Sequence, residues 1–336
     1  MFTIIRCISL RVTFSKKNRR TESTLVKTTE IALVIRMELW IFASLLAATL
    51  QTVRFMLQKV LSRAQLSTAG ATFSRFCYSA PFLWVVVFIY FLKSGAGPPE
   101  LSFWFWVFAS LGGVSQILAT VCVVTLFKSR NFAVGITFKK TEVIQAVLVG
   151  QILLQESVSL EGFIAILIGL FGVLLLSDQA GISDARTHRF FNRATGLGLM
   201  SGFLFAISAV AYRGATLEVS MPSAMTTAMV TLLWVVTLQV VLMGVWIYLR
   251  EPGQLAAVWN ARKSAVWIGL TSMGGSFGWF TAFNLQNAAY VKALGQIEIL
   301  LSMAAGYFFF HEKMTIREFA GVGFLALSIV ILVLAT

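Results

Sequence analysis

Ten stretches of about twenty mostly apolar residues follow one another along the chain. An α-helix of this length crosses the hydrocarbon core of a bilayer, whereas a soluble fold cannot cover so many long apolar segments. We therefore expect an all-α, polytopic membrane protein with ten transmembrane helices. They are predicted near 38–59, 71–92, 102–127, 132–154, 160–177, 195–216, 223–249, 264–286, 290–310 and 317–335.

The composition supports this class. Hydrophobic residues make up 58% of the 336 positions and charged residues 12%, against roughly 25% charged in soluble proteins. The mean hydropathy is +0.83. An ordinary cytosolic enzyme and a disordered chain are thereby disfavoured. The three cysteines, Cys7, Cys77 and Cys122, are odd in number and lack metal-ligand spacing, so neither a disulfide framework nor a metal site is expected.

The formal net charge of +13 does not indicate a nucleic-acid partner. Lys and Arg are concentrated in residues 1–36 and at the ends of the apolar runs, where such residues set membrane orientation. The loops after odd-numbered spans are the more basic, which predicts both termini outside the cytoplasm. The expected partner is the lipid bilayer, and the sequence does not indicate an oligomeric state.

Four regions are expected. Residues 1–36 form a basic tail, and Met37 opens the first apolar helix directly, so the native protein is hypothesised to start there. Residues 37–178 and 195–336 each hold five predicted helices, and 179–194 form a polar connector between them.

The two halves repeat each other. A shift of 156 positions places Glu142 on Glu298 and Gly150 on Gly306, and a shift of 159 places Arg54 on Arg213. Matched charges within spans are informative because each costs about 2.5–3.5 kcal/mol at the bilayer centre. Since each repeat has an odd number of helices, the second must enter the membrane upside down. Inverted repeats of this kind are an architecture of secondary transporters.

The end of each repeat carries a motif, LLQESVSLEGFIAILIGLFGVLLL in the first and FFHEKMTIREFAGVGFLALSIVIL in the second. With these motifs, residues 38–335 resemble the EamA-type carriers of the drug/metabolite transporter superfamily, in which Glu156 and Glu312 match the turn glutamate and Gly172 and Gly321 the helix glycines. The resemblance implies a carrier with both termini inside the cell, opposite to the orientation that the basic loops favour. Many members carry a proline close to the positions of Glu142 and Glu298, and this chain does not.

Charged and polar residues inside the fourth and ninth spans are the main site candidates. They are spaced to share a helical face, and lipid solvates none of them. Under the functional hypothesis they bind substrate and protons between the two helices; otherwise Glu142 pairs with Lys139 or Lys140, and Glu298 with Lys292, as structural ion pairs. The candidates are Lys139, Lys140, Glu142, Gln145, Lys292, Glu298 and Ser302.

Residues of other spans are secondary candidates. Gln116, Trp279 and Asn284 could line the site or simply pack between helices. Arg54 and Arg213 either extend to the headgroups or act as counter-ions for an anionic substrate.

The turn glutamates, Glu156 and Glu312, could instead have a purely structural role at the starts of helices. Glu156 and Glu312 precede Ser159 and Thr315, which are expected to cap the following helices.

These observations favour a secondary membrane transporter that moves a small metabolite or drug-like solute by alternating access, with proton coupling through Glu142 and Glu298. The excess of lysine over glutamate in the presumed cavity favours an anionic or zwitterionic substrate. No catalytic constellation, metal-ligand set or cofactor motif is found, so an enzyme is not expected. The alternatives are a lipid-modifying membrane enzyme and a non-transporting accessory subunit. The expected location is the bacterial inner membrane.

Overall fold

The computed structural model describes residues 39–55, 57–58, 66–95, 97–127, 138–177, 193–301, 303 and 315–335, and their regular structure is entirely helical. Contacts divide the chain into two units, Met1–Leu39 and Trp40–Thr336. The basic tail, the hypothesised start at Met37 and nearly all of the connector lie outside the described residues.

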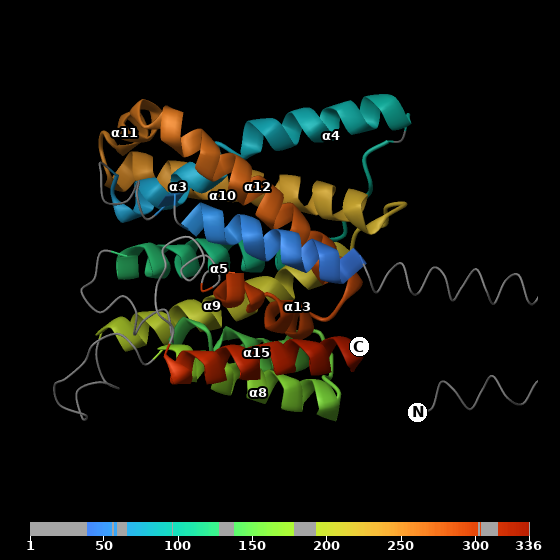
Figure 1. The fold of residues 1–336 in the computed structure, drawn as a ribbon. Helices are drawn as coiled ribbons and strands as arrows, with labels where there is room; N and C mark the ends of the chain where they lie inside the picture. The colour runs from blue at the N-terminus through green and yellow to red at the C-terminus, as the bar shows by residue number, and fades with distance from the viewer. Residues whose placement is uncertain are drawn as a thin grey trace, which may run out of the picture. The chain divides into compact units, whose positions relative to one another are not determined.

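The described helices lie within or close to the predicted apolar runs, and Figure 1 shows how they are arranged. Those of the first half are Leu39–Phe55, α3 (Thr68–Cys77), α4 (Ala80–Ser94), α5 (Phe103–Phe127), α7 (Glu142–Leu153) and α8 (Leu160–Ser177). Those of the second half are α9 (Arg193–Leu217), α10 (Ala224–Arg250), α11 (Gln254–Asn260), α12 (Arg262–Leu285), α13 (Ala288–Leu294), a short segment at 297–301, and α15 (Ile316–Leu334).

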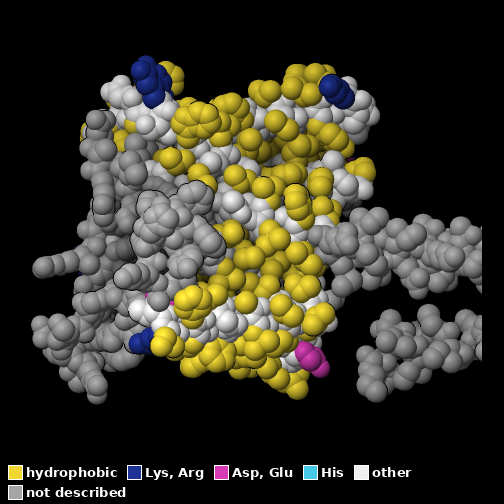
Figure 2. Space-filling view, in the orientation of Figure 1, with side chains coloured by type: hydrophobic (Ala, Val, Ile, Leu, Met, Phe, Trp, Pro, Cys, Tyr) yellow, Lys and Arg dark blue, Asp and Glu magenta, His cyan; other side chains and the backbone are white. Residues whose placement is uncertain are grey.

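Among the described residues, five helical segments are long and apolar enough to cross a membrane, with α3 and α4 counted together as Thr68–Ser94, and three shorter ones are also apolar. Large hydrophobic side chains are exposed on their outer faces, among them Phe88, Trp104, Ile152 and Phe171. Figure 2 shows hydrophobic side chains over the middle of the helices and charged ones at their ends. Exposed apolar surface on this scale is stable in lipid and costly in water. The chain is therefore a helical membrane protein.

The second predicted span is interrupted. It was expected as one helix over 71–92, but α3 ends at Cys77 and α4 begins at Ala80. Pro81 stands in the first turn of α4. Because proline has no backbone N–H and its ring clashes with the carbonyl of the residue four positions earlier, a continuous helix through this point is disfavoured.

The fourth and ninth predicted spans are interrupted as well. A turn at Lys140–Thr141 precedes α7, and a turn at Gly295–Gln296 follows α13. The shift of 156 by which the sequence predicts a repeat brings Lys140 onto Gln296, so the two breaks occupy matching places in the sequence. The expectation of uninterrupted helices over 132–154 and 290–310 is therefore corrected within the described residues.

The two halves interlock through exchanged helix pairs. α5 packs against α9, while the helix Leu39–Phe55 packs against α12, where Gly278 faces the backbone of Ala43. The last helices of the halves, α8 and α15, pack against each other. Between these pairs lies a core that includes Phe105, Tyr212 and Phe280. Residues of both halves therefore surround the centre of the protein.

Candidate functional site

The interrupted helices bring a buried carboxylate and two ammonium groups together. Glu142 is only 4% exposed. Its Oε2 lies 3.5 Å from Lys139 Nζ, and its Oε1 lies 3.8 Å from Lys292 Nζ. Lys139 precedes the break before α7, and Lys292 precedes the break after α13. The contact between α7 and α13 therefore joins the two halves through charge.

The second carboxylate is also bound across the halves. Glu298 Oε1 forms an ion pair with Lys140 Nζ. Gln51 Nε2 donates to Glu298 Oε2 at 3.0 Å, and Trp279 Nε1 donates to Gln51 Oε1 at 3.2 Å. The alternative in which Glu298 pairs with Lys292 is therefore corrected, because Lys292 contacts Glu142 instead. Each carboxylate contacts a lysine from the opposite half.

Aromatic rings surround the buried ammonium groups. Lys139 Nζ lies 4.9 Å from the ring centre of Phe205, and Lys292 Nζ lies 5.2 Å from that of Trp279 and 5.6 Å from that of Phe205. The negative ring faces attract a cation. They partly replace the water that these groups lose on burial.

A small chamber, with about 20 Å³ open to the centre of a water molecule, lies beside this charge cluster. We call it the central chamber, and its walls come from helices of both halves. The lining residues are Gln51, Arg75, Gln116, Phe205, Ser208, Ala209, Tyr212, Ser276, Trp279, Phe280, Phe283 and Lys292. Three of the sequence candidates, Gln116, Trp279 and Lys292, are among them.

Arg75 is a chamber residue that the sequence analysis did not select. It is 4% exposed. Its Nε donates to Ser272 Oγ at 2.7 Å, its Nη1 to Thr120 Oγ1 at 3.2 Å and its Nη2 to Ser276 Oγ at 3.4 Å. The signal was an arginine inside a run of small and aromatic residues. It resembled an interfacial residue because it stands one turn from the predicted start of the second span.

Gln116, Tyr212 and Gln239 form a hydrogen-bonded group with Gln116 at its centre. Its Oε1 accepts from Tyr212 Oη at 3.1 Å and from Gln239 Nε2 at 3.0 Å. Gln239 Nε2 also donates to the carbonyl of Gly113 at 3.1 Å. This group links α5, α9 and α10 and fixes the chamber wall on that side.

Other candidates lie beside the chamber or outside the described residues. The Oε1 of Gln145 is buried, and a side chain at Gly202 would meet it at 2.9 Å. Asn284 Nδ2 donates to the carbonyl of Thr216 at 3.2 Å, a contact between α12 and α9. Ser302 and Glu312 lie outside the described residues.

The two arginines that the predicted repeat matches, Arg54 and Arg213, each bind a polar side chain. Arg54 is 2% exposed, donates to Gln58 Oε1 at 3.0 Å and lies over the ring of Phe55. Arg213 donates to Glu156 Oε1 at 2.6 Å. The alternative in which the side chain extends to the headgroups is therefore corrected for Arg54, and neither arginine lines the central chamber.

The first residues of α8 and α15, which follow Glu156 and Glu312 in the sequence, are capped as the sequence predicted. Ser159 Oγ accepts from the backbone N–H of Gly162 at 3.1 Å at the start of α8. Thr315 forms a reciprocal capping box with Glu318 at the start of α15. Both capping predictions are confirmed. Glu156 binds Arg213 rather than a helix end.

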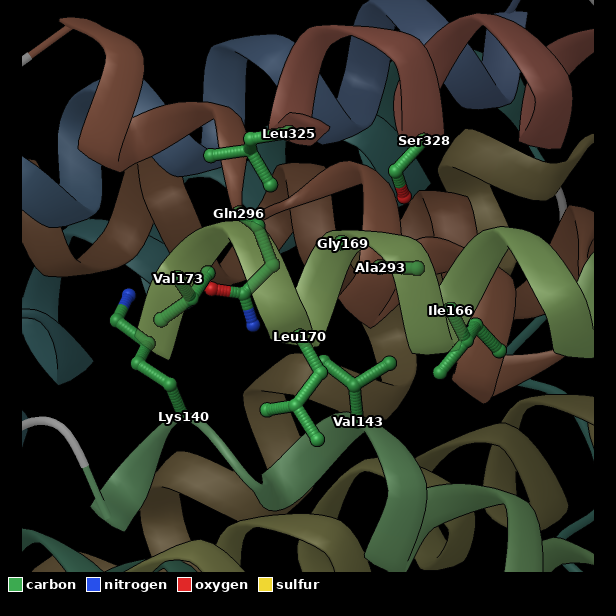
Figure 3. A pocket seen from close by; sticks show the side chains of 10 residues that line it. All are labelled: Lys140, Val143, Ile166, Gly169, Leu170, Val173, Ala293, Gln296, Leu325 and Ser328. Atoms are coloured by element: carbon green, nitrogen blue, oxygen red, sulfur yellow. The ribbon is translucent and has the colours of Figure 1, made fainter. Parts of the chain in front are cut away.

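A second pocket, with about 10 Å³ open to the centre of a water molecule, lies between α8, α15 and the interrupted helices (Figure 3). Leu325 and Ser328 stand on one side and Val143 on the other, with Gln296 between them. Lys140 also lines this pocket. A chain of contacts thus runs from Trp279 in the central chamber through Gln51 and Glu298 to Lys140 in the second pocket.

Within the part of the chain that the structure describes, no group of three or more His, Cys, Asp or Glu side chains could hold a metal ion. Among the described residues, the titratable groups at the centre include lysine, arginine, tyrosine and two glutamates. Such groups can bind charged solutes and exchange protons.

No protein-family model and no curated protein matches the sequence. A solved crystal structure, described only as that of a protein, is similar in fold, with a TM-score of 0.64 at 15% sequence identity. The similarity covers 90% of this chain and 99% of the other. At this identity it shows a shared fold and nothing about activity.

Proposed function

We propose that this protein is a secondary membrane transporter of the EamA type, with ten spans in two inverted repeats, that moves a small metabolite or drug-like solute by alternating access. The observation that carries the proposal is the pair of interrupted helices whose carboxylates each contact a lysine of the opposite half. Discontinuous helices at the interface between repeats are where secondary transporters place their binding sites.

The helix pairs support the inverted repeat. The third span of the first half, α5, packs on the first span of the second half, α9. The reciprocal pair is the helix Leu39–Phe55 with α12, where Gly275 and Gly278 approach Ala47 and Ala43. Exchanged pairs of this kind are expected when a two-fold axis relates the halves. The equivalent glutamates then lie on both sides of that axis.

The crossed ion pairs link the charge state of the two glutamates to the movement of the halves. Glu142 with Lys292 and Glu298 with Lys140 hold the halves together. If one half rocks against the other, these contacts must break or exchange partners. Neutralising a carboxylate by a proton weakens its attraction to lysine, so proton binding can bias the change. Proton coupling through Glu142 and Glu298 is accordingly part of the proposal.

The test is solute flux in vesicles that contain the purified full chain. A panel of radiolabelled metabolites is screened with and without an imposed pH gradient, and the wild type is compared with Glu142→Gln and Glu298→Gln. We expect the gradient to drive uptake of at least one solute by the wild type and both variants to lose this response. Glu161→Gln makes the same chemical change at an exposed position on α8 and should transport normally.

Other outcomes favour the alternatives. Absence of flux for every solute would contradict the proposal and favour a non-transporting accessory subunit, whereas chemical conversion of added lipid would favour a lipid-modifying enzyme. Normal gradient-driven uptake by both glutamine variants would retain transport but remove the role of these carboxylates. The proposed location is the bacterial inner membrane.

A further inference from the structure

We infer that the central chamber, in the conformation that alternating access opens to solute, binds an organic anion, with its oxyanion group held between Arg75 and Lys292 and its apolar body against the aromatic wall. This inference rests on the proposed function and narrows the substrate class. Neither the sequence candidates nor the family resemblance includes Arg75.

The charge of Arg75 has only neutral partners among the described residues. Its three hydrogen-bond acceptors are hydroxyl groups, on Ser272, Thr120 and Ser276. Hydroxyls satisfy N–H groups but do not neutralise a charge, and an isolated buried charge is costly. A guanidinium presents paired donors that match the two oxygens of a carboxylate or phosphate. The arrangement therefore favours an oxyanion as its partner.

The rest of the chamber wall defines the remainder of the ligand. Lys292 adds a second positive charge, and none of the described lining residues is Asp or Glu. Phe205, Trp279 and Phe280 supply flat apolar surface. An ammonium group would meet two cations and no carboxylate in this wall. An anion is therefore favoured over the zwitterionic alternative.

Glu142 competes with the ligand for Lys292. The carboxylate contacts the ammonium group from outside the chamber, at 3.8 Å. When Glu142 loses its negative charge, Lys292 loses this partner and can attract an anion in the chamber more strongly. Lys139 and Lys140 also act on Glu142 electrostatically, so a neutral Glu142 raises the positive potential beside the chamber.

Binding to the detergent-purified full chain tests the site. The probes share one ring and differ in charge: benzoate, phenyl phosphate, benzylamine, phenylalanine and benzyl alcohol. Calorimetric titration should detect benzoate or phenyl phosphate, and the stronger of the two identifies the oxyanion. Benzylamine and phenylalanine should bind at least tenfold more weakly. Equal binding of benzylamine and benzoate would overturn the inference.

Variants assign the binding to named residues. Arg75→Gln should weaken anion binding more than tenfold, Arg75→Lys less, and Glu142→Gln should strengthen it. Arg250→Gln, at an exposed position, should bind as the wild type does. If Arg75→Gln fails to fold, Arg75→Lys and Glu142→Gln still move affinity in opposite directions. Wild-type affinity in Arg75→Gln, or in both Arg75→Lys and Glu142→Gln, would overturn the site.

The result separates this inference from the proposed function. Anion binding that depends on Arg75, without solute flux in vesicles, would retain the site and contradict transport. Gradient-driven flux of a cation that Arg75→Gln leaves unchanged would retain transport and contradict the anion site.

Discussion

Arg213 Nε donates to Glu156 Oε1 at 2.6 Å, and Arg213 Nη1 donates to the carbonyls of Phe283 and Gln286 at 2.6 and 2.8 Å. One guanidinium thus joins α9, the turn between α7 and α8, and the end of α12. The carbonyls at the end of a helix lack intrahelical partners and carry partial negative charge. Arg213 satisfies two of them while its charge is balanced by Glu156.

Removing either member of this pair should destabilise the protein. Arg213→Gln and Glu156→Gln each leave the partner's charge largely buried without its counter-ion. The free energy of unfolding should fall by about 3 kcal/mol in each variant, the low end for a broken buried pair, because the side chains are partly accessible. Thermal unfolding in detergent should show both losses, and the double variant should lose less than their sum. Fully additive losses would show that the two side chains do not interact. Arg250→Gln is the exposed control.

The two motif glycines face each other between α8 and α15. A Cβ on Gly321 would lie 2.9 Å from the carbonyl oxygen of Gly172, which is backbone and cannot turn aside. Gly321→Ala should therefore destabilise the protein by about 1–3 kcal/mol through overpacking. Gly323→Ala, two residues along α15, meets open space and should be neutral or stabilising by up to about 1 kcal/mol. Similar unfolding midpoints for the two variants would contradict close packing of these helices.

The hydrogen-bonded group around Gln116 can be tested by comparing its buried tyrosine with an exposed tyrosine elsewhere in the chain. Tyr212→Phe removes the hydroxyl that donates to Gln116 and accepts from Gln239, and this buried loss should cost about 1–3 kcal/mol. Tyr248 is 73% exposed, so Tyr248→Phe should leave stability unchanged. Unfolding by added denaturing detergent compares the two. If Tyr212→Phe unfolds at the wild-type midpoint, the hydroxyl contributes nothing to the wall.

Local features of the fold could be predicted from the sequence. The helical segments follow the apolar runs because burial in lipid depends on length and hydropathy alone. Ser159 and Thr315 cap helices because a cap depends on residues within one turn. The contact of Lys139 with Glu142 is also local, since side chains three residues apart share a helical face.

Contacts between the halves could not be predicted in this way. Lys140 with Glu298 and Lys292 with Glu142 join residues more than 140 positions apart, and which lysine meets which carboxylate depends on how the interrupted helices pack. The burial of Arg75 depends likewise on α5 and α12, which supply its hydroxyl partners. The breaks in the fourth and ninth predicted spans contain no proline, so the apolar runs alone predicted continuous helices there.

Exchanging the charges of Lys140 and Glu298 tests whether this pair holds the halves together. Lys140→Glu places two carboxylates face to face and should cost about 3–5 kcal/mol, the range for a broken buried pair. Adding Glu298→Lys restores opposite charges, so the double variant should recover most of the stability. Lys263→Glu controls for a charge change at an exposed position. The measurement is the unfolding midpoint of each variant. A double variant no more stable than Lys140→Glu would mean that the surrounding groups, including Gln51, stabilise the pair only when the lysine is at 140 and the glutamate at 298. A wild-type midpoint for Lys140→Glu would show that the pair does not hold the halves together.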